Sequence, residues 1–332
     1  MKTAGARPDP AEAREPSDTL DELLRRRLVQ VLGKGGVGRT SVAAAIAIAA
    51  AKRGRRTLVI ETDPRTPIAA QHGLRASFQT APAAPNLWLM LLDRQASLEE
   101  YLGFVVARPL LRAVFASALY QYFVHAAPAL RELMMMGKIY HEVERRGAPP
   151  WDLVVADLPA SGQALGMIGT PLAARETFGG NLVGREAAEV ARLFRDANKC
   201  AMILVTTAEP LALTETLEIH RQLAAWQITT GAIVFNRMTA AAFTGVDIAR
   251  MMERGSRERT LKHLEDLAAI ARAELQRRTR QRRALGILKR QIGAPIVQLE
   301  EACLLGPETL TEHLANRLDR RTAPTGERGA ES

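Results

Sequence analysis

Short apolar runs alternate with longer stretches of helical composition along most of this chain. Each run is bounded by turn or polar residues, as buried strands of a parallel sheet covered on both faces should be. Because helical stretches separate the runs, the pattern predicts an α/β fold, with a doubly wound, mainly parallel sheet and crossover helices. The runs are LVQVL (28–32), TLVIE (57–61), DLVVAD (152–157), AMILVTT (201–207), GAIVFN (231–236) and APIVQLE (294–300).

Two segments of helical composition interrupt this pattern. Residues 86–149 contain SLEEYLGFVV, in which Ser97 and Glu100 have the spacing of a capping box, and the methionine-rich stretch LRELMMMGKI. Residues 240–293 are helical in composition and increasingly basic. We therefore expect two α-helical insertions on a sheet built from residues 17–85, 150–239 and 294–320, with disordered tails at residues 1–16 and 321–332.

The composition is that of an ordinary soluble protein, with 47% apolar and 24% charged residues among 332. Two cysteines, Cys200 and Cys303, cannot build a disulfide framework or a CxxC metal site, which suits a reducing cytoplasm. Cys200 lies in a predicted strand and is expected to be a small buried residue. The N-terminus lacks the apolar core of a secretion signal, and the run VAAAIAIAAA ends at Lys52, too short to span a membrane.

The formal net charge is +9, and much of the excess lies in RAELQRRTRQRRALGILKR, from Arg272 to Arg290. Apolar residues recur within this stretch at helical spacing, which favours a solvated helix face. Such a cluster could also meet nucleic acid or anionic lipid. Because it holds no aromatic residue, we expect no stable binding to nucleic acid, whereas a transient membrane contact stays open.

The sequence GKGGVGRTS, residues 33–41, follows the first apolar run and precedes a helical stretch. It matches the phosphate-binding pattern GxxxxGK(S/T) except at Arg39, which stands at the position of the lysine. Glycines let backbone N–H groups approach phosphate oxygens, the following helix N-terminus adds partial positive charge, and Thr40 offers a hydroxyl to magnesium. The sequence therefore predicts a P-loop nucleotide-binding domain whose phosphate site comprises Gly33, Lys34, Gly35, Gly36, Val37, Gly38, Arg39, Thr40 and Ser41.

The extra lysine of this loop, Lys34, carries the first resemblance to a known family. GKGGVG resembles the deviant Walker A loop of the MinD, ParA and ArsA group of ATPases. In these families the signature lysine reaches across a dimer interface to the nucleotide of the partner. The resemblance therefore implies a nucleotide-dependent dimer in which Lys34 acts on the neighbouring subunit's nucleotide.

Further segments resemble the ArsA and eukaryotic guided-entry ATPases, in the order that this family has them. ETDPRTP is similar to switch I and places Asp63 where those enzymes orient the attacking water. DLPASGQAL is similar to switch II, with Asp157 at the magnesium-side aspartate, and VFNRM places Asn236 at the asparagine that recognises adenine. The resemblance covers nearly the whole chain and implies ATP and Mg²⁺ as ligands, with Thr40 and Asp157 organising the metal. Both aspartates also follow predicted strands, at the edge where open α/β sheets bind ligands.

Arg39 is the most consequential departure from this family. Guanidinium binds phosphate, but it is planar and wider than an ammonium group. Misplacing one electrostatic donor costs about 2.7–4 kcal/mol, or a factor of roughly 10²–10³ in rate, which predicts a slow ATPase. Gln163 also replaces the switch II histidine, and the zinc-binding CxxC and the arsenite-binding cysteine cluster are absent.

The sequence thus favours a cytoplasmic ATPase of the ArsA and guided-entry type, as a homodimer or a heterodimer with a related ATPase. Its opening and closing would gate an apolar or membrane-protein client on the insertion at residues 86–149. Two alternatives stay open: a hydrolysis-impaired regulatory subunit that pairs with an active paralogue, and a MinD- or ParA-like positioning ATPase. The C-terminal stretch TLTEHLANRLDRR has Leu310, Leu314 and Leu318 on one face and is expected to pack back onto the sheet.

Overall fold

A computed structural model describes residues 16–62, 69, 75, 77–105, 128–144, 150–240, 244–257, 262–302 and 309–319. Asp63, Cys303, residues 1–15 and residues 320–332 lie outside these ranges, so the expectations placed on them stay predictions. Within the described part, no helix has the length and apolar composition needed to cross a membrane.

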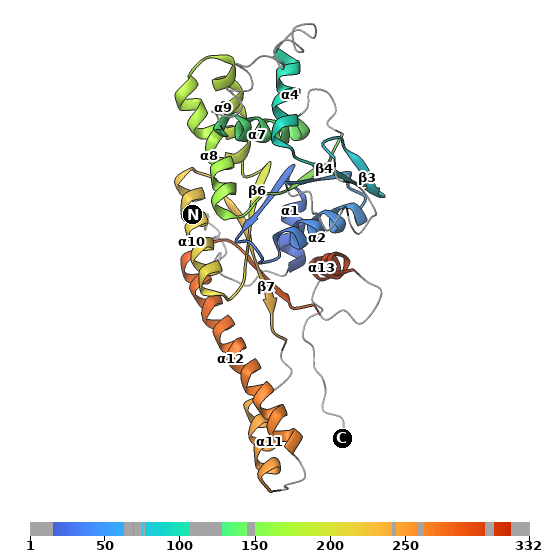
Figure 1. The fold of residues 1–332 in the computed structure, drawn as a ribbon, viewed down its shortest axis with the longest axis vertical. Coiled ribbons are helices and arrows are strands. Elements are labelled where there is room, and N and C mark those ends of the chain that lie inside the picture. Colours follow the sequence, from blue (N-terminus) through green and yellow to red (C-terminus); the bar gives the residue numbers. More distant parts are fainter. Residues whose placement is uncertain are drawn as a thin grey trace, which may run out of the picture.

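The centre of the molecule is an eight-stranded sheet with helices on both faces (Figure 1). Its spatial order is β3-β4-β2-β5-β1-β6-β7-β8, and every neighbouring pair is parallel except β3 and β4. This arrangement confirms the doubly wound, mainly parallel sheet, and all six strands expected from the apolar runs are present. The strands are β1 (Leu28–Gly33), β2 (Thr57–Glu61), β3 (Ala81–Ala84), β4 (Leu87–Leu91), β5 (Leu153–Asp157), β6 (Cys200–Thr206), β7 (Thr230–Met238) and β8 (Ile296–Glu300).

Alternate residues of the central strands enter two separate cores, one on each face of the sheet. Val29 and Val31 of β1 face the core that holds α1 (Pro16–Leu24), α2 (Arg39–Lys52) and α13 (Leu310–Asp319). Leu28 and Leu32 face the core that holds α7 (Pro128–Glu144), α8 (Ser161–Phe178), α9 (Leu182–Arg195), α10 (Pro210–Ala225) and α12 (Lys262–Gln291). Burial on both faces explains why these strands are apolar throughout.

The C-terminal helix α13 packs back onto the body, as expected, but it lies mainly on α2 rather than on the sheet (Figure 1). Leu314 and Leu318 are each 3% exposed and belong to the core on that face, whereas Leu310 is 39% exposed. Residues Val42 to Ala51 of α2 are all buried and mostly alanine, so their small side chains let α13 approach closely. This helix therefore covers α2 on the outer side of that core.

The segment 86–149 begins with a strand that the sequence analysis missed. Residues 87–91 form β4, which pairs in parallel with β2, and the helical part starts only with α4 (Arg94–Val105). The expected capping box is also wrong. Asp93 accepts a hydrogen bond from the backbone of Ala96 at 2.7 Å and so caps α4, while the Ser97 hydroxyl donates back to the Asp93 carbonyl at 2.6 Å. Glu100 instead forms an ion pair with Lys138 of α7 at 2.9 Å.

The three consecutive methionines of α7 are core residues. Met134, Met135 and Met136 are 5%, 3% and 0% exposed. Met135 and Met136 pack with strand residues of the main core, and Met134 packs against Leu98 of α4 in a smaller cluster. In this conformation they line no exposed groove, so a client surface on this end of the molecule must use other side chains.

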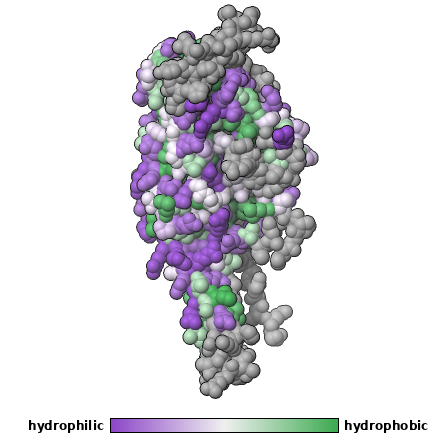
Figure 2. Space-filling model, viewed as in Figure 1, coloured by the Kyte–Doolittle hydropathy of each residue, from purple (hydrophilic) through white to green (hydrophobic). Residues whose placement is uncertain are grey.

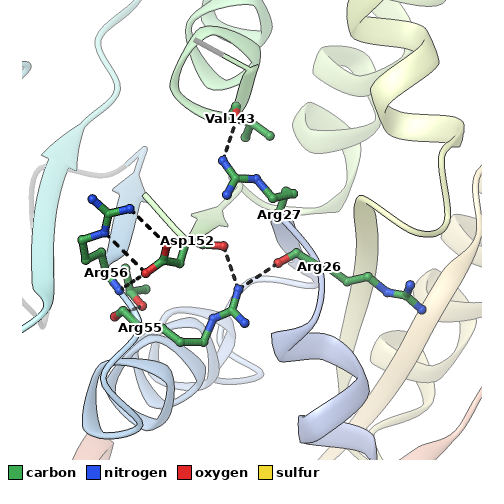
Figure 3. A network of polar contacts seen from close by, with 7 residues as sticks. Arg26, Arg27, Arg55, Arg56, Val143 and Asp152 are labelled. Carbon is green, nitrogen blue, oxygen red and sulfur yellow. Dashed lines mark hydrogen bonds and ion pairs between the residues drawn. The ribbon is translucent and has the colours of Figure 1, made fainter. Parts of the chain in front are cut away.

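The amino ends of the central strands are closed by a polar network (Figure 3). The Arg56 backbone and guanidinium both donate to the Asp152 carboxylate, at 2.8 and 3.2 Å, and hydrogen bonding to Arg56 holds the pKa of this carboxyl below its ordinary value. Arg55 donates to the Asp152 carbonyl at 2.7 Å, and Arg27 donates to the Val143 carbonyl at 3.1 Å at the end of α7. These contacts fix the strands at one edge, so the opposite, carboxyl edge is where loops form a ligand site.

Candidate nucleotide site

The loop between β1 and α2 has a backbone that only glycine accepts at two positions. Gly33 has a φ of 152°, and a Cβ there would lie 2.3 Å from the Val205 carbonyl oxygen of β6. Gly38 has a φ of 96°, and its Cβ would lie 2.4 Å from the Asn236 amide nitrogen. The loop therefore lies directly against β6 and β7. Glycine is needed at positions 33 and 38 because a side chain would block these contacts.

The first turn of α2 opens toward this loop. Gly38 is the N-cap of the helix in a left-handed conformation, and it has no side chain that could cap the first N–H groups. A Cβ on Gly35 or Gly36 would meet nothing within 4 Å among the described residues, so the outer side of the loop is open. Helix N–H groups without a side-chain cap, beside an open glycine loop, fit a phosphate group.

Thr40 and Asp157 come together beside the first turn of α2. The Thr40 hydroxyl donates to the Asp157 Oδ2 at 2.6 Å, and Asp157 is 5% exposed at the carboxyl end of β5. The Thr62 hydroxyl donates to the Asp157 carbonyl at 3.0 Å and steadies the same strand end. A hydroxyl and a carboxylate oxygen side by side are ligands that Mg²⁺ prefers, so the residues present fit this metal.

Arg39, the first residue of α2, donates from its guanidinium to the Leu158 carbonyl, which directly follows Asp157. The guanidinium is half-buried and lies over the start of the segment that resembles switch II. Lys34 lies on the same loop with a half-exposed side chain. The structure thus brings both basic residues to the loop, while Asp63 lies outside the described residues.

Asn236 supports the loop from β7. Its side chain is 6% exposed, its Nδ2 donates to the Val37 carbonyl at 2.9 Å, and its Oδ1 accepts from the Arg237 backbone at 2.9 Å. Both ends of the amide are therefore engaged in the protein in this conformation. Its expected contact with adenine stays a prediction, and it would require this amide to exchange partners.

Glu61, which the sequence analysis had not singled out, is a second buried carboxylate beside Asp157. It ends β2 with a side chain that is 1% exposed, and its Cα pairs with that of Asp157 in the parallel register. Residues in register on parallel neighbours point to one face, so both carboxylates lie on the face covered by α2. The sequence already pointed to Glu61, because the apolar run TLVIE ends in a carboxylate. An apolar residue would have been enough for packing at this position.

Comparison with known proteins agrees with this geometry. A family model described as ArsA_ATPase, anion-transporting ATPase, matches residues 26–182, which span the loop, Thr40, Asp157 and the β1–β5 pair. These matches support the ArsA/GET3 family of ATPases as the relatives of this chain. The resemblance expected from the loop and switch segments is thereby confirmed.

Two relatives show how much of this chain the similarity covers. The chain is 29% identical over 237 residues to the ATPase BagA of Mycobacterium tuberculosis, covering 68% of this chain and 69% of the relative. It is 25% identical over 301 residues to the ATPase GET3 of Blastomyces gilchristii, covering 78% of this chain and 86% of the relative. The second match covers 78% of this chain, so the similarity is not confined to residues 26–182.

Proposed function

We propose that this protein binds ATP with Mg²⁺ and hydrolyses it slowly as a dimeric switch. The observation that carries the proposal is the contact of Thr40 with Asp157 at 2.6 Å, beside an open glycine loop at the carboxyl edge of the sheet. That pair has the donor set for Mg²⁺, and the first turn of α2 has the N–H groups for phosphate. Similarity to a family of ATPases supports the same chemistry.

Each residue of the site has a part in this proposal. The loop amides and Arg39 hold the outer phosphates of ATP, and Thr40 and Asp157 hold the metal. When bound, Mg²⁺ would neutralise charge that develops on the phosphate oxygens. Asp63 orients the attacking water, Lys34 reaches the nucleotide of the partner subunit, and Asn236 turns from the loop toward adenine. The dimer is formed with a second copy or with a related ATPase.

Arg39 also weakens ATP binding, because its guanidinium has a competing acceptor in the protein. A hydrogen bond from a charged donor is worth about 1.5–3 kcal/mol, so leaving the Leu158 carbonyl for phosphate lowers apparent affinity by roughly 10- to 150-fold unless a new contact replaces it. The same contact favours a second candidate function, in which the subunit binds nucleotide without useful turnover and regulates an active paralogue.

The client in this proposal is an apolar segment of a membrane protein, bound at the end of the molecule formed by α4, α7, α8 and α9 (Figure 1). Phe178 and Leu182, at the turn between α8 and α9, are 45% and 44% exposed and are the large exposed apolar side chains there among the described residues. A poly-leucine helix peptide should bind the ATP-loaded protein, and Phe178→Asp with Leu182→Asp should weaken that binding about tenfold or more.

The deciding experiment measures ATP binding and hydrolysis by the purified protein together with Asp63→Asn and Arg39→Lys. Turnover that disappears in Asp63→Asn and rises in Arg39→Lys is expected. ATP binding without turnover in the wild type, with turnover appearing in Arg39→Lys, would move the protein to the regulatory class. Absence of ATP binding in both would overturn the proposal.

A further inference from the structure

Helix α12 accounts for +6 of the formal net charge of +9. Its 30 residues include nine Lys or Arg and three Asp or Glu, and all three acidic residues precede Leu275. From Leu275 to Gln291 the helix holds seven basic residues and no acidic one. An excess of this size on one element costs repulsion within the protein, and a structural helix does not need it.

One half of α12 is fixed to the body and cannot take part in binding. Leu285 and Leu288 belong to the main core, and Gln281 donates to the Arg237 carbonyl at 3.0 Å. The opposite half faces solvent and forms a shallow groove of about 380 Å³. We call this groove and its rim the α12 basic face: Thr279, Arg282, Arg283, Gly286, Ile287 and Arg290, flanked by Arg280 and Lys289.

Gly286 shapes the groove by leaving a gap in the middle of the arginines. A Cβ there would lie 3.3 Å from the Arg290 guanidinium, so a larger residue would crowd this arginine and fill the floor of the groove. Ile287 adds an apolar side chain at the same level. The face therefore combines spread positive charge with a shallow, partly apolar floor.

The arginines of this face have no ion-pair partner among the described residues. Other surface arginines have carboxylate partners, for example Arg277 with Glu301 at 2.9 Å and Arg317 with Glu300 at 2.7 Å. Among the residues that the structure describes, no carboxylate lies within ion-pair distance of Arg282, Arg283 or Arg290. Their charge is available to an external anion.

The position of the α12 basic face on the molecule indicates what kind of anion can contact all its arginines. Helices α10 and α12 run along one long edge, and hydrophilic side chains line that edge in Figure 2. From Arg280 to Arg290 the face extends about 15 Å along the helix axis. A flat surface with many negative charges can touch the whole face at once, and lipid phosphates can sit between the arginine side chains.

Two other partners fit less well. Binding of single-stranded nucleic acid by base stacking needs aromatic side chains, and the 30 residues of α12 include no Phe, Trp or Tyr. A second copy of this face would bring like charges together, because a two-fold contact pairs each patch with itself.

We propose that the α12 basic face docks this protein on a membrane surface rich in anionic lipid, with headgroup phosphates in the groove around Gly286. The protein then lies on the membrane without crossing it. Each basic residue near such a surface contributes roughly fivefold to the partition constant, so three arginines together contribute roughly 100-fold. The contact is electrostatic and weakens with salt within a Debye length of about 8 Å at physiological ionic strength.

Vesicle flotation of the full chain tests this proposal. The variant combines Arg282→Gln, Arg283→Gln and Arg290→Gln, and it is compared on vesicles of phosphatidylcholine with and without 30% phosphatidylserine. The control combines Arg25→Gln, Arg175→Gln and Arg185→Gln, exposed arginines outside α12 that remove the same charge. ATP binding and the melting temperature of both variants show that they are folded and that the nucleotide site is intact.

The wild type and the control should bind only the vesicles with phosphatidylserine, and 0.5 M salt should release both. The α12 variant should bind roughly 100-fold more weakly. Equal loss in variant and control, equal binding to pure phosphatidylcholine, or no binding by the wild type would each overturn the proposal. Duplex DNA that displaces the wild type at equal phosphate concentration would assign the face to nucleic acid and also overturn it.

Discussion

The contact between Asn236 and the glycine loop gives a prediction whose size follows from the structure. The Asn236 Nδ2 donates to the Val37 carbonyl at 2.9 Å in a site that is 6% exposed. Asn236→Asp keeps the oxygen that accepts from the Arg237 backbone but places a second oxygen against that carbonyl. Removing the donor from a buried carbonyl costs about 1–3 kcal/mol, or about 1.5–4 °C of melting temperature for a chain of 332 residues.

The effect should depend on pH with a definite sign. A carboxyl group buried against a carbonyl oxygen has a raised pKa, because burial disfavours its charged form. When protonated it can donate to Val37 and restore the contact, so the variant is most stable at low pH. Its stability falls as pH rises through the raised pKa, by about 1.4 kcal/mol per pH unit at most.

Thermal melts of the wild type, Asn236→Asp and the exposed control Asn198→Asp between pH 5 and pH 8 measure this. The difference in melting temperature between the wild type and Asn236→Asp should grow as pH rises. The ATP affinity of the variant should fall in parallel, because the loop loses its support. The control should follow the wild type within about 0.5 kcal/mol. A gap that is the same at both ends of the pH range, or no larger than that of the control, would refute the assignment of Asn236 as the support of the loop.

Three further predictions follow from single contacts. Thr40→Val should lower ATP affinity about tenfold or more with Mg²⁺ and little without it, whereas Thr40→Ser should keep the Mg²⁺ dependence, as calorimetry would show. Burial raises the pKa of the Cys200 thiol to about 12. In a Cys303→Ser background, maleimide should therefore label Cys200 at pH 8 only after unfolding. Rapid labelling of the native protein would contradict the burial of this thiol. Burial, with a smaller effect of Arg221, lowers the pKa of His220, whose Nδ1 lies 3.0 Å from the Thr230 hydroxyl. Since the unfolded state then binds more protons, the free energy of unfolding should fall as pH drops below about 6.5. Denaturant melts of His220→Gln should show a smaller fall.

The sequence by itself determined the nucleotide loop and most of the sheet. Strands buried on both faces must be apolar throughout, so β1, β2, β5, β6, β7 and β8 were visible as short runs. Glycine is required wherever the backbone turns to positive φ or touches another strand, so Gly33 and Gly38 could be recognised without coordinates. The residues of the loop are consecutive in the chain, so a local sequence pattern is enough to recognise it.

Only the tertiary structure decided which distant groups meet. The bond between Asn236 and Val37 joins residues 199 positions apart, and β4 is a strand because its neighbour β2 supplies hydrogen bonds, not because its residues alternate. The methionines of α7 proved to be core because α4, α8 and the sheet cover them, which no local pattern states. The charge of α12 was evident in the sequence, but the packing of one half of that helix decided which arginines face outward. Burial and pairing depend on the whole fold, and that is the part of this protein that its consecutive residues could not specify.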